Sequence, residues 1–210
     1  MSEQKKYEFT GKIKTIFGIE FKQIRAIISF GCVVAGEIGG WIEKEENLSQ
    51  SGNAWVYGNA EVSGDAWVYG NAWVYGNAEV SGDAEVSGNA RVSGNARVSG
   101  DAEVYGNAEV SGDAWVYGNA EVSGNARVSG DAEVKKDDDY MVIGGAGRCN
   151  RFTTFFKCRD KTIKVICGCF FGTIIEFRAK VKETHKGNKH EKVYLAMADI
   201  VELQLDDDDK

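Results

Sequence analysis

The sequence contains no proline, only two histidines and five cysteines among its 210 residues. The 26 glycines without proline exclude a collagen-like chain, and 43% hydrophobic residues exclude a disordered one. No run approaches the roughly 18 apolar residues that a transmembrane helix requires. The odd number of cysteines, most of them late in the sequence, does not indicate a secreted disulfide framework.

The two ends of the sequence carry no targeting signal. The first ten residues, MSEQKKYEFT, are polar and lack the apolar run of a signal peptide. We therefore expect a soluble cytoplasmic protein with reduced thiols. The last five residues, DDDDK at 206–210, match the enterokinase recognition sequence of expression tags, so no functional argument rests on them.

Charge is unevenly distributed along the chain, whose net charge is −7. Residues 51–134 carry twelve acidic residues and three arginines, a net charge of −9. Residues 135–210 carry fifteen basic and thirteen acidic residues, a net charge of +2. An acidic middle is therefore joined to a mildly basic end.

The middle of the chain is a short internal repeat. From residue 51 to 134 the phrase x-Val-(Ser/Tyr)-Gly-(Asn/Asp)-Ala runs through fourteen hexads without an insertion. Alternation with period two places the alanine and valine of each hexad on one face, which we expect to be buried. Glycine followed by asparagine or aspartate tolerates positive φ and predicts a corner. Three hexads then close one coil of 18 residues, and stacked coils bury each other's aliphatic columns.

This pattern resembles the hexapeptide repeat of left-handed β-helices, in which an aliphatic residue recurs every six positions and a small residue precedes it by two. The resemblance implies a mainly β fold, a left-handed parallel β-helix with 18-residue triangular coils over 51–134. We expect a small N-terminal β cap with a degenerate first coil over 1–50 and an α+β module over 135–205.

The flanking segments predict how the array is capped. Two strands are expected around Gly18, and residues 40–43 imitate a hexad that is out of frame with the array. After the array, a hairpin is expected with one shared face: Ile163, Val165, Cys167, Cys169 and Phe171. The spacing of Thr173 and Glu176 predicts a capping box and a helix that buries Ile174, Phe177 and Val181. A second helix is expected to bury Val193, Met197, Ile200 and Leu203.

Three sets of outward residues are candidate sites, because 18-residue stacking aligns equivalent positions. The first is a corner column of amides that can hydrogen-bond between coils: Asn53, Asn71, Asn89, Asn107 and Asn125. The second is a set of aromatic residues of the kind enriched at protein interfaces: Trp55, Tyr57, Trp73, Tyr75, Trp67, Tyr69, Trp115 and Tyr117. The third is an acidic face: Asp65, Asp83, Glu85, Asp101, Glu103 and Glu121. Trp73 and Arg91 are placed for a cation–π contact.

The array offers no residue that titrates near neutral pH. Acyltransferases with this repeat use a histidine as general base between neighbouring β-helices, whereas His185 and His190 both lie outside the array. We therefore predict no catalytic residue, no cofactor and no metal, and keep an acyltransferase-like enzyme as an alternative. A zinc site remains the less favoured interpretation of four thiols, Cys149, Cys158, Cys167 and Cys169.

GGWIEKEENLSQ before the array and GCFFGTIIEFRAKVKETHKG after it resemble uncharacterised hexapeptide-repeat proteins of phages and prophages of gut bacteria. That resemblance implies a phage-encoded protein in the cytoplasm of a bacterial host. We interpret the chain as a non-enzymatic structural or interaction protein, a rigid acidic rod that presents a C-terminal recognition module. We expect it to form a homo-oligomer or to bind a protein partner, with no membrane contact and no direct nucleic-acid binding.

The alternative interpretation is an inhibitor of a host nucleic-acid-binding or defence protein. Carboxylates regularly spaced on a rigid rod resemble a row of phosphates and are able to occupy a basic groove.

Overall fold

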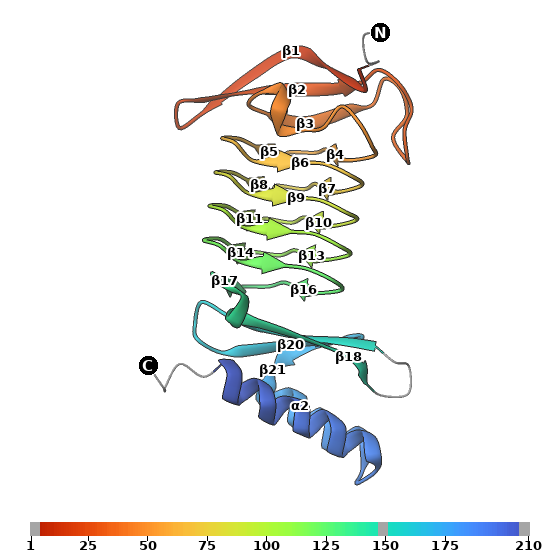
Figure 1. Cartoon of the computed structure of the whole chain (residues 1–210), viewed down its shortest axis with the longest axis vertical. Coiled ribbons are helices and arrows are strands. Elements are labelled where there is room, and N and C mark those ends of the chain that lie inside the picture. Colours follow the sequence, from red (N-terminus) through yellow and green to blue (C-terminus); the bar gives the residue numbers. More distant parts are fainter. Residues whose placement is uncertain (1–4, 147–150, 206–210) are drawn as a thin grey trace.

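The computed structural model describes residues 5–146 and 151–205, which form a three-sided prism with a cap at each end (Figure 1). The chain runs from an N-terminal hairpin through stacked coils into a small sheet and two helices. No helix among the described residues is long and apolar enough to cross a membrane.

Fourteen two-residue strands make up the array. They are β4 (Trp55–Val56), β5 (Glu61–Val62), β6 (Trp67–Val68), β7 (Trp73–Val74), β8 (Glu79–Val80), β9 (Glu85–Val86), β10 (Arg91–Val92), β11 (Arg97–Val98), β12 (Glu103–Val104), β13 (Glu109–Val110), β14 (Trp115–Val116), β15 (Glu121–Val122), β16 (Arg127–Val128) and β17 (Glu133–Val134). We call β4, β7, β10, β13 and β16 the first wall, β5, β8, β11, β14 and β17 the second wall, and β6, β9, β12 and β15 the third wall.

Equivalent strands of successive coils pair in parallel and in register, 18 residues apart. Val92, for example, lies between Val74 and Val110 in the first wall. Every alanine and valine of the array is at most 1% exposed. The predicted parallel β-helix with an aliphatic interior is therefore confirmed.

Each corner of the prism needs a glycine for two reasons. The array glycines have φ between 66° and 75°, a region that side chains with a Cβ rarely adopt. They also stack directly on one another, so a Cβ at Gly88 would lie 2.8 Å from the backbone nitrogen of Gly106. The corner therefore excludes side chains both by conformation and by close approach of the next coil.

The predicted amide column at the corner before the first wall is present. Each asparagine side chain donates to the next coil, from Asn53 to Asn71 at 2.9 Å through to Asn107 and Asn125 at 3.4 Å. A second column, before the second wall, runs through Asn59, Asn77 and Asn95 and ends when Asn95 donates to Asp113 at 2.9 Å. Because the donors all point toward the C-terminal end, a carboxylate fits as the last acceptor of such a column.

A degenerate coil begins the prism. Ile42, in β3 (Ile38–Ile42), pairs with Val62, and Leu48 forms a parallel bridge with Val68. Both therefore occupy valine positions, and two extra residues between Leu48 and Val56 account for the broken frame. A 3-10 turn over Glu45–Asn47 makes the intervening corner, and a similar turn over Asp137–Asp139 follows the last coil.

The N-terminal cap is a hairpin that continues the second wall. Strands β1 (Tyr7–Ile16) and β2 (Ile19–Ala26) pair antiparallel, and β2 pairs with β3. The two strands predicted around Gly18 are therefore present. The cap also buries Lys6, which is 1% exposed, donates to the carbonyl of Ala54 at 2.8 Å and lies 4.9 Å from the ring of Phe30.

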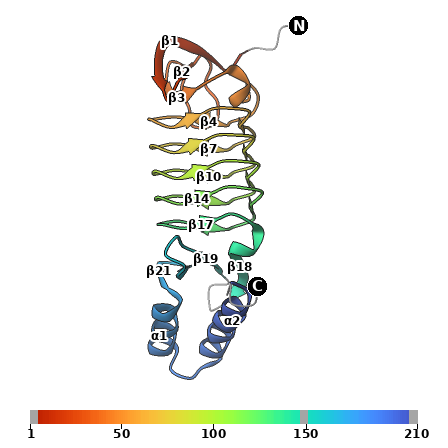
Figure 2. The ribbon, with the colours of Figure 1, turned by 90° about the vertical axis from the view of Figure 1, so that its left-hand side faces the viewer.

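The C-terminal cap is an antiparallel sheet placed between the prism and the helices. Its strands are β18 (Tyr140–Ala146), β19 (Arg151–Lys157), β20 (Ile163–Cys167) and β21 (Phe170–Thr173). Side chains alternate between its faces, so Phe156 and Ile166 pack on the end of the prism while Phe155 and Val165 pack on the helices. Figure 2 shows both helices on the side of this sheet that faces away from the coils.

The predicted shared face of the hairpin is wrong beyond Cys167. The chain turns at Gly168, whose φ is 62°, and enters β21 as a new strand. Cys169 is therefore exposed in the turn, and Phe171 is 51% exposed. The prediction treated the apolar residues on both sides of Gly168 as one strand, because a hydrophobic pattern alone does not reveal a tight turn.

Both predicted helices are present, but the predicted buried face is correct only for the first. Helix α1 (Ile174–His185) has the Thr173–Glu176 capping box and buries Ile174, Phe177 and Val181. Helix α2 (Lys189–Leu205) buries Tyr194, Met197, Ala198, Val201 and Leu205. Of the predicted stripe only Met197 is buried; Val193 is half-buried, and Ile200 and Leu203 are 54% and 84% exposed. The tyrosine and the small alanine were not counted as core, although both lie on one face of a 3.6-residue period.

Gly88 and Gly124 form a matched pair for testing the corners. Their φ values are 66° and 67°, but a Cβ at Gly124 would meet no described atom within 4 Å. We expect Gly124→Ala to lower the free energy of unfolding by about 1–2 kcal/mol through positive φ alone. Gly88→Ala should cost about 1–3 kcal/mol more, because the next coil must shift. Denaturant unfolding measures both, and equal losses would contradict coil stacking as the second reason for glycine.

Lys6 predicts a pH effect on stability. Burial lowers its pKa from 10.5 to about 8, so between these pH values the unfolded chain binds more protons than the folded chain. The Lys6 contribution to the free energy of unfolding should therefore rise as pH increases from about 8 to 10.5. Denaturant unfolding of wild type and Lys6→Met across this range isolates the contribution; a stability difference between the two that is independent of pH would refute it.

Candidate functional site

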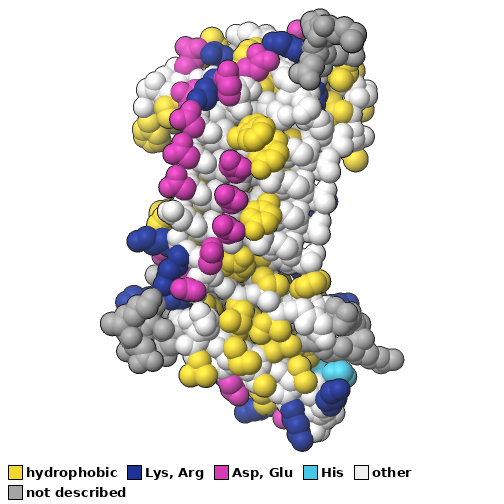
Figure 3. Space-filling model, viewed as in Figure 1, with side chains coloured by type: hydrophobic (Ala, Val, Ile, Leu, Met, Phe, Trp, Pro, Cys, Tyr) yellow, Lys and Arg dark blue, Asp and Glu magenta, His cyan; other side chains and the backbone are white. Residues whose placement is uncertain are grey.

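The acidic face predicted from the sequence is assembled on the third wall. Glu85, Glu103 and Glu121 lie in register on successive coils. The aspartates Asp65, Asp83 and Asp101 occupy the corner that precedes this wall, and all three are exposed. Figure 3 shows two columns of acidic side chains running down the same side of the array. Because coils are about 4.8 Å apart, the six carboxylates spread over four coils place one charge per about 3.2 Å of the prism axis on average.

Neighbouring side chains hold several of these carboxylates in place. The hydroxyl of Tyr69 donates to Glu85 at 3.0 Å, and that of Tyr105 donates to Glu121 at 3.0 Å. Lys44 donates to Asp65, and this hydrogen bond lowers the pKa of Asp65. The face is therefore an ordered array of carboxylates whose spacing is set by the coil repeat.

An exposed aromatic pair lies at the upper end of the acidic column. Trp67 pairs in register with Glu85, and its ring stacks on that of Tyr69 with centroids 4.0 Å apart. Trp67 is 41% exposed, which is high for the largest side chain. The third wall thus combines a flat aromatic surface with carboxylates, a composition typical of interfaces with basic partners.

Trp55 does not belong to the exposed aromatic set, and its prediction as an outward residue was wrong. The ring is 0% exposed and packs edge-on against Phe30 at 5.4 Å and Tyr7 at 6.4 Å between ring centroids. Its position in the repeat points outward, but the N-terminal cap covers the first wall there. Its indole nitrogen has no hydrogen-bond partner among the described residues.

The remaining first-wall aromatics form a half-buried cluster below the cap. Tyr57 stacks on Tyr75 with centroids 5.0 Å apart and meets Trp73 edge-on at 5.5 Å. Trp73 and Arg91 are neighbours in register, but the Arg91 guanidinium is 3.6 Å from Glu109 on the next coil. The predicted cation–π pair is therefore replaced by an ion pair.

The cation–π contacts of the array are instead made by Trp115 on the second wall. The guanidinium groups of Arg97 and Arg159 lie 5.5 and 5.0 Å from its ring centroid. The neighbouring Tyr117 donates to Glu133 at 2.6 Å, a hydrogen bond that raises the pKa of Tyr117 to about 12. The contact with Arg159 could not be found from the repeat, because that residue belongs to the C-terminal cap.

The thiols considered for a zinc site do not converge among the described residues. Cys158 is buried with the prism end and Cys167 lies in the helix-facing cluster, so the two are on opposite sides of the sheet. Cys169 is exposed in a turn, and Cys149 lies outside the described residues.

One other group of potential ligands was not predicted. The ligand atoms of Asp131, Cys158 and Asp160 lie within 4.8 Å of one another. Lys164 already donates to Asp131, and burial raises the pKa of the Cys158 thiol to about 12. A protonated thiol and a carboxylate paired with an ammonium are poor metal ligands, so the group is better explained as a contact between the cap and the last coil.

The two histidines lie together at the tip of the helical hairpin. His185 is the last residue of α1 and His190 the second residue of α2, with ring centroids 5.7 Å apart. Figure 3 shows histidine surface at the end of the molecule beyond the C-terminal sheet. Neither side chain is placed to serve as a base at a coil of its own chain.

Comparisons with known proteins point to the repeat. A family model described as the YdcK beta solenoid repeat matches residues 84–100 and 90–104, both within the array. The uncharacterized acetyltransferase YdcK of Escherichia coli (strain K12) is 43% identical over 51 residues. That similarity covers 24% of this chain and 15% of the relative. The chain is a β-solenoid repeat protein that spans a small part of the relative's length.

Trp55 and Trp67 test which aromatic residues are structural. Trp55→Ala should lower the free energy of unfolding by about 3–5 kcal/mol, because it empties a fully buried site beneath the cap. Trp67→Ala, at the same position of the hexad but with a side chain that is 41% exposed, should change it by less than about 1 kcal/mol. Denaturant unfolding compares the two variants, and similar losses would mean that Trp67 is also a core residue.

Proposed function

We propose that this β-solenoid is a non-enzymatic interaction protein whose third wall binds a basic surface of a protein partner. The observation that carries the proposal is the in-register carboxylate array beside the exposed Trp67–Tyr69 stack. A wall of short hydrogen-bonded strands orders these groups before binding, so little conformational entropy is lost on association. Phage origin and self-association, both expected from the sequence, belong to this proposal as its biological context.

The other walls support the choice of the third. On the first wall, Glu109 lies between Arg91 and Arg127, which pair with it at 3.6 and 3.4 Å. On the second wall, Glu79 pairs with Arg97 at 3.3 Å. These carboxylates are paired with arginines of the same chain. Among the described residues no cation pairs with Glu85, Glu103 or Glu121, and their charge is available to a partner.

A second candidate function is mimicry of nucleic acid, and the spacing of charge favours it. The two acidic columns carry one charge per about 3.2 Å of axis on average, which is close to the one per about 3.4 Å along a single strand of duplex DNA. A host protein with a groove for a nucleic-acid backbone is the kind of partner that this density fits. The two candidates share one face and differ in whether DNA competes for the partner.

Acyl transfer, the remaining alternative, has less support. Both histidines lie at the helical tip, away from the coils. The relative named as an acetyltransferase is similar to this chain over 15% of its own length.

Affinity capture from a bacterial lysate tests the proposal with matched variants. One variant carries Glu85→Gln, Glu103→Gln and Glu121→Gln on the third wall. The control carries Glu79→Gln, Glu109→Gln and Glu133→Gln and removes the same charge from the other walls. We expect specific partners to fall at least tenfold with the third-wall variant and to stay within about twofold with the control, as quantified by mass spectrometry.

Addition of duplex DNA to the same capture separates the two candidates. Partners displaced by DNA support mimicry, while partners retained support a general interaction role. Retention of every wild-type partner by the third-wall variant, with circular dichroism confirming that it is folded, would refute binding through this face.

A further inference from the structure

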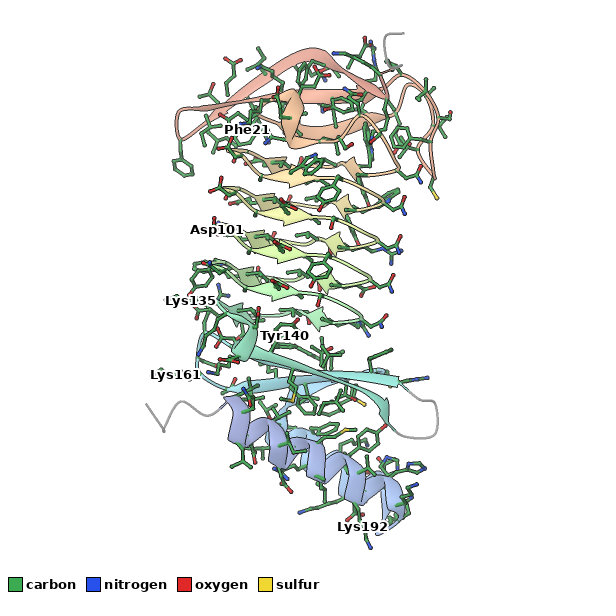
Figure 4. The ribbon with its side chains drawn as sticks, in the orientation of Figure 1. Phe21, Asp101, Lys135, Tyr140, Lys161 and Lys192 are labelled. Atoms are coloured by element: carbon green, nitrogen blue, oxygen red, sulfur yellow. The ribbon has the colours of Figure 1, made fainter. Side chains whose placement is uncertain are left out.

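A cleft of about 640 Å³ opens where the prism meets the C-terminal cap, below the corner that carries Asp65, Asp83 and Asp101. It lies between the end of the second wall, the turn joining β19 and β20, and the adjoining ends of α1 and α2. Figure 4 shows Lys135 and Lys161 on the same side of the molecule, one from the end of the array and the other from the cap. Its volume is within the range of small-molecule sites.

Three cations of the cleft have no carboxylate partner. Among the described residues, no carboxylate lies within ion-pair distance of Lys135, Arg159 or Lys161. Arg159 is held in place, because its backbone nitrogen donates to Asp131 at 3.2 Å and its guanidinium lies against the ring of Trp115. Lys161 has a φ of 64°, a left-handed conformation that is costly for lysine. Such strained residues cluster at binding sites.

The acidic groups that line the cleft are already satisfied. Glu133 accepts from Tyr117 at 2.6 Å. Asp139 accepts the backbone N–H groups of Lys135 and Lys136 at 2.9 and 3.0 Å. Glu202 accepts from Arg178, outside the cleft. These hydrogen bonds leave the three carboxylates charged, but the cations of the lining outnumber them: Lys135, Lys136, Lys157, Arg159 and Lys161. Positive charge is therefore in excess here on a chain whose net charge is −7.

The lining of the cleft also has an aliphatic part. Ile163, Ile174 and Ile175 line it, and Ile175 is 75% exposed in the first turn of α1. A ligand that contacts both parts needs an anionic head for the cations and an apolar body for the isoleucines. Two negative charges and several acceptor oxygens, as in a phosphate group, match three cations that line one cleft better than one carboxylate does.

We propose that this cleft binds a small amphipathic anion with a phosphate head and an aliphatic chain. The head contacts Lys135, Arg159 and Lys161, and the chain lies against Ile163 and Ile175. The site shares no residue with the acidic face, so it stands or falls independently of the proposed partner binding.

Isothermal titration with hexyl phosphate, inorganic phosphate and 1-hexanol tests the site on the full chain. Hexyl phosphate should bind at least tenfold more tightly than either fragment. Arg159→Gln with Lys161→Gln should weaken hexyl phosphate at least tenfold. Lys180→Gln with Lys182→Gln, which removes the same charge from the outer side of α1, should leave it within about twofold.

Ile175→Ser tests the contribution of the aliphatic chain separately from that of the phosphate head. Because this side chain is largely exposed, the variant should fold, weaken hexyl phosphate severalfold and leave inorganic phosphate unchanged. Hexyl phosphate binding equally to wild type and to the Arg159/Lys161 variant would overturn the proposal, as would binding no tighter than that of 1-hexanol.

Four aspartates, residues 206–209, follow Leu205, which also lines the cleft. The titration is therefore repeated with all four changed to asparagine. Equal or tighter binding of hexyl phosphate supports the site, because the cations are then at least as available. Failure of both chains to bind hexyl phosphate overturns it.

Discussion

The hydrogen bond from a backbone N–H to the carbonyl of the seventeenth following residue sets the geometry of this molecule. It recurs through the array at close to 2.9 Å, for example from Arg91 to Ala108 and from Ser93 to Val110. Strands of two residues have no stability alone, so each coil depends on its neighbours for both hydrogen bonds and apolar contact. The first and last coils lack one neighbour, and the two caps supply it with Ile42 and Leu48 at one end and Phe156 and Ile166 at the other.

The same regularity organises the surface. Because every coil has the same shape, the same amino acid at one position of each coil forms a column along the prism. Asparagine at that position makes an amide ladder, and glutamate or aspartate makes a row of carboxylates. The third wall is such a column, and its function follows from repetition. The cleft beside Arg159 is of the opposite kind. It exists because the repeat stops at Val134 and a differently built unit meets the last coil.

The repeat made much of the fold predictable. Val, Ala and the column from Asn53 to Asn125 could be placed by counting, since their environment is other copies of the same hexad. Trp55 could not, because its burial depends on Tyr7 and Phe30 from the N-terminal cap. Ile200 and Leu203 were misplaced for a related reason. Apolar residues occur on more than one face of helix α2, and packing against Phe155 and Phe177 determines which face is buried.

The corners have a consequence for how such a chain changes length. The turns at Glu45–Asn47 and Asp137–Asp139 lie at the same edge of the prism, one before and one after the uninterrupted hexads. Gain or loss of three hexads would lengthen or shorten the rod by one coil and leave both ends facing the same directions. Gain or loss of a single hexad would instead swing the C-terminal cap round by a third of a turn. The number of hexads thus sets both the length of the rod and the angle between the two caps about its axis. Duplication of hexads within the gene could change either quantity while the contacts within each coil stay the same.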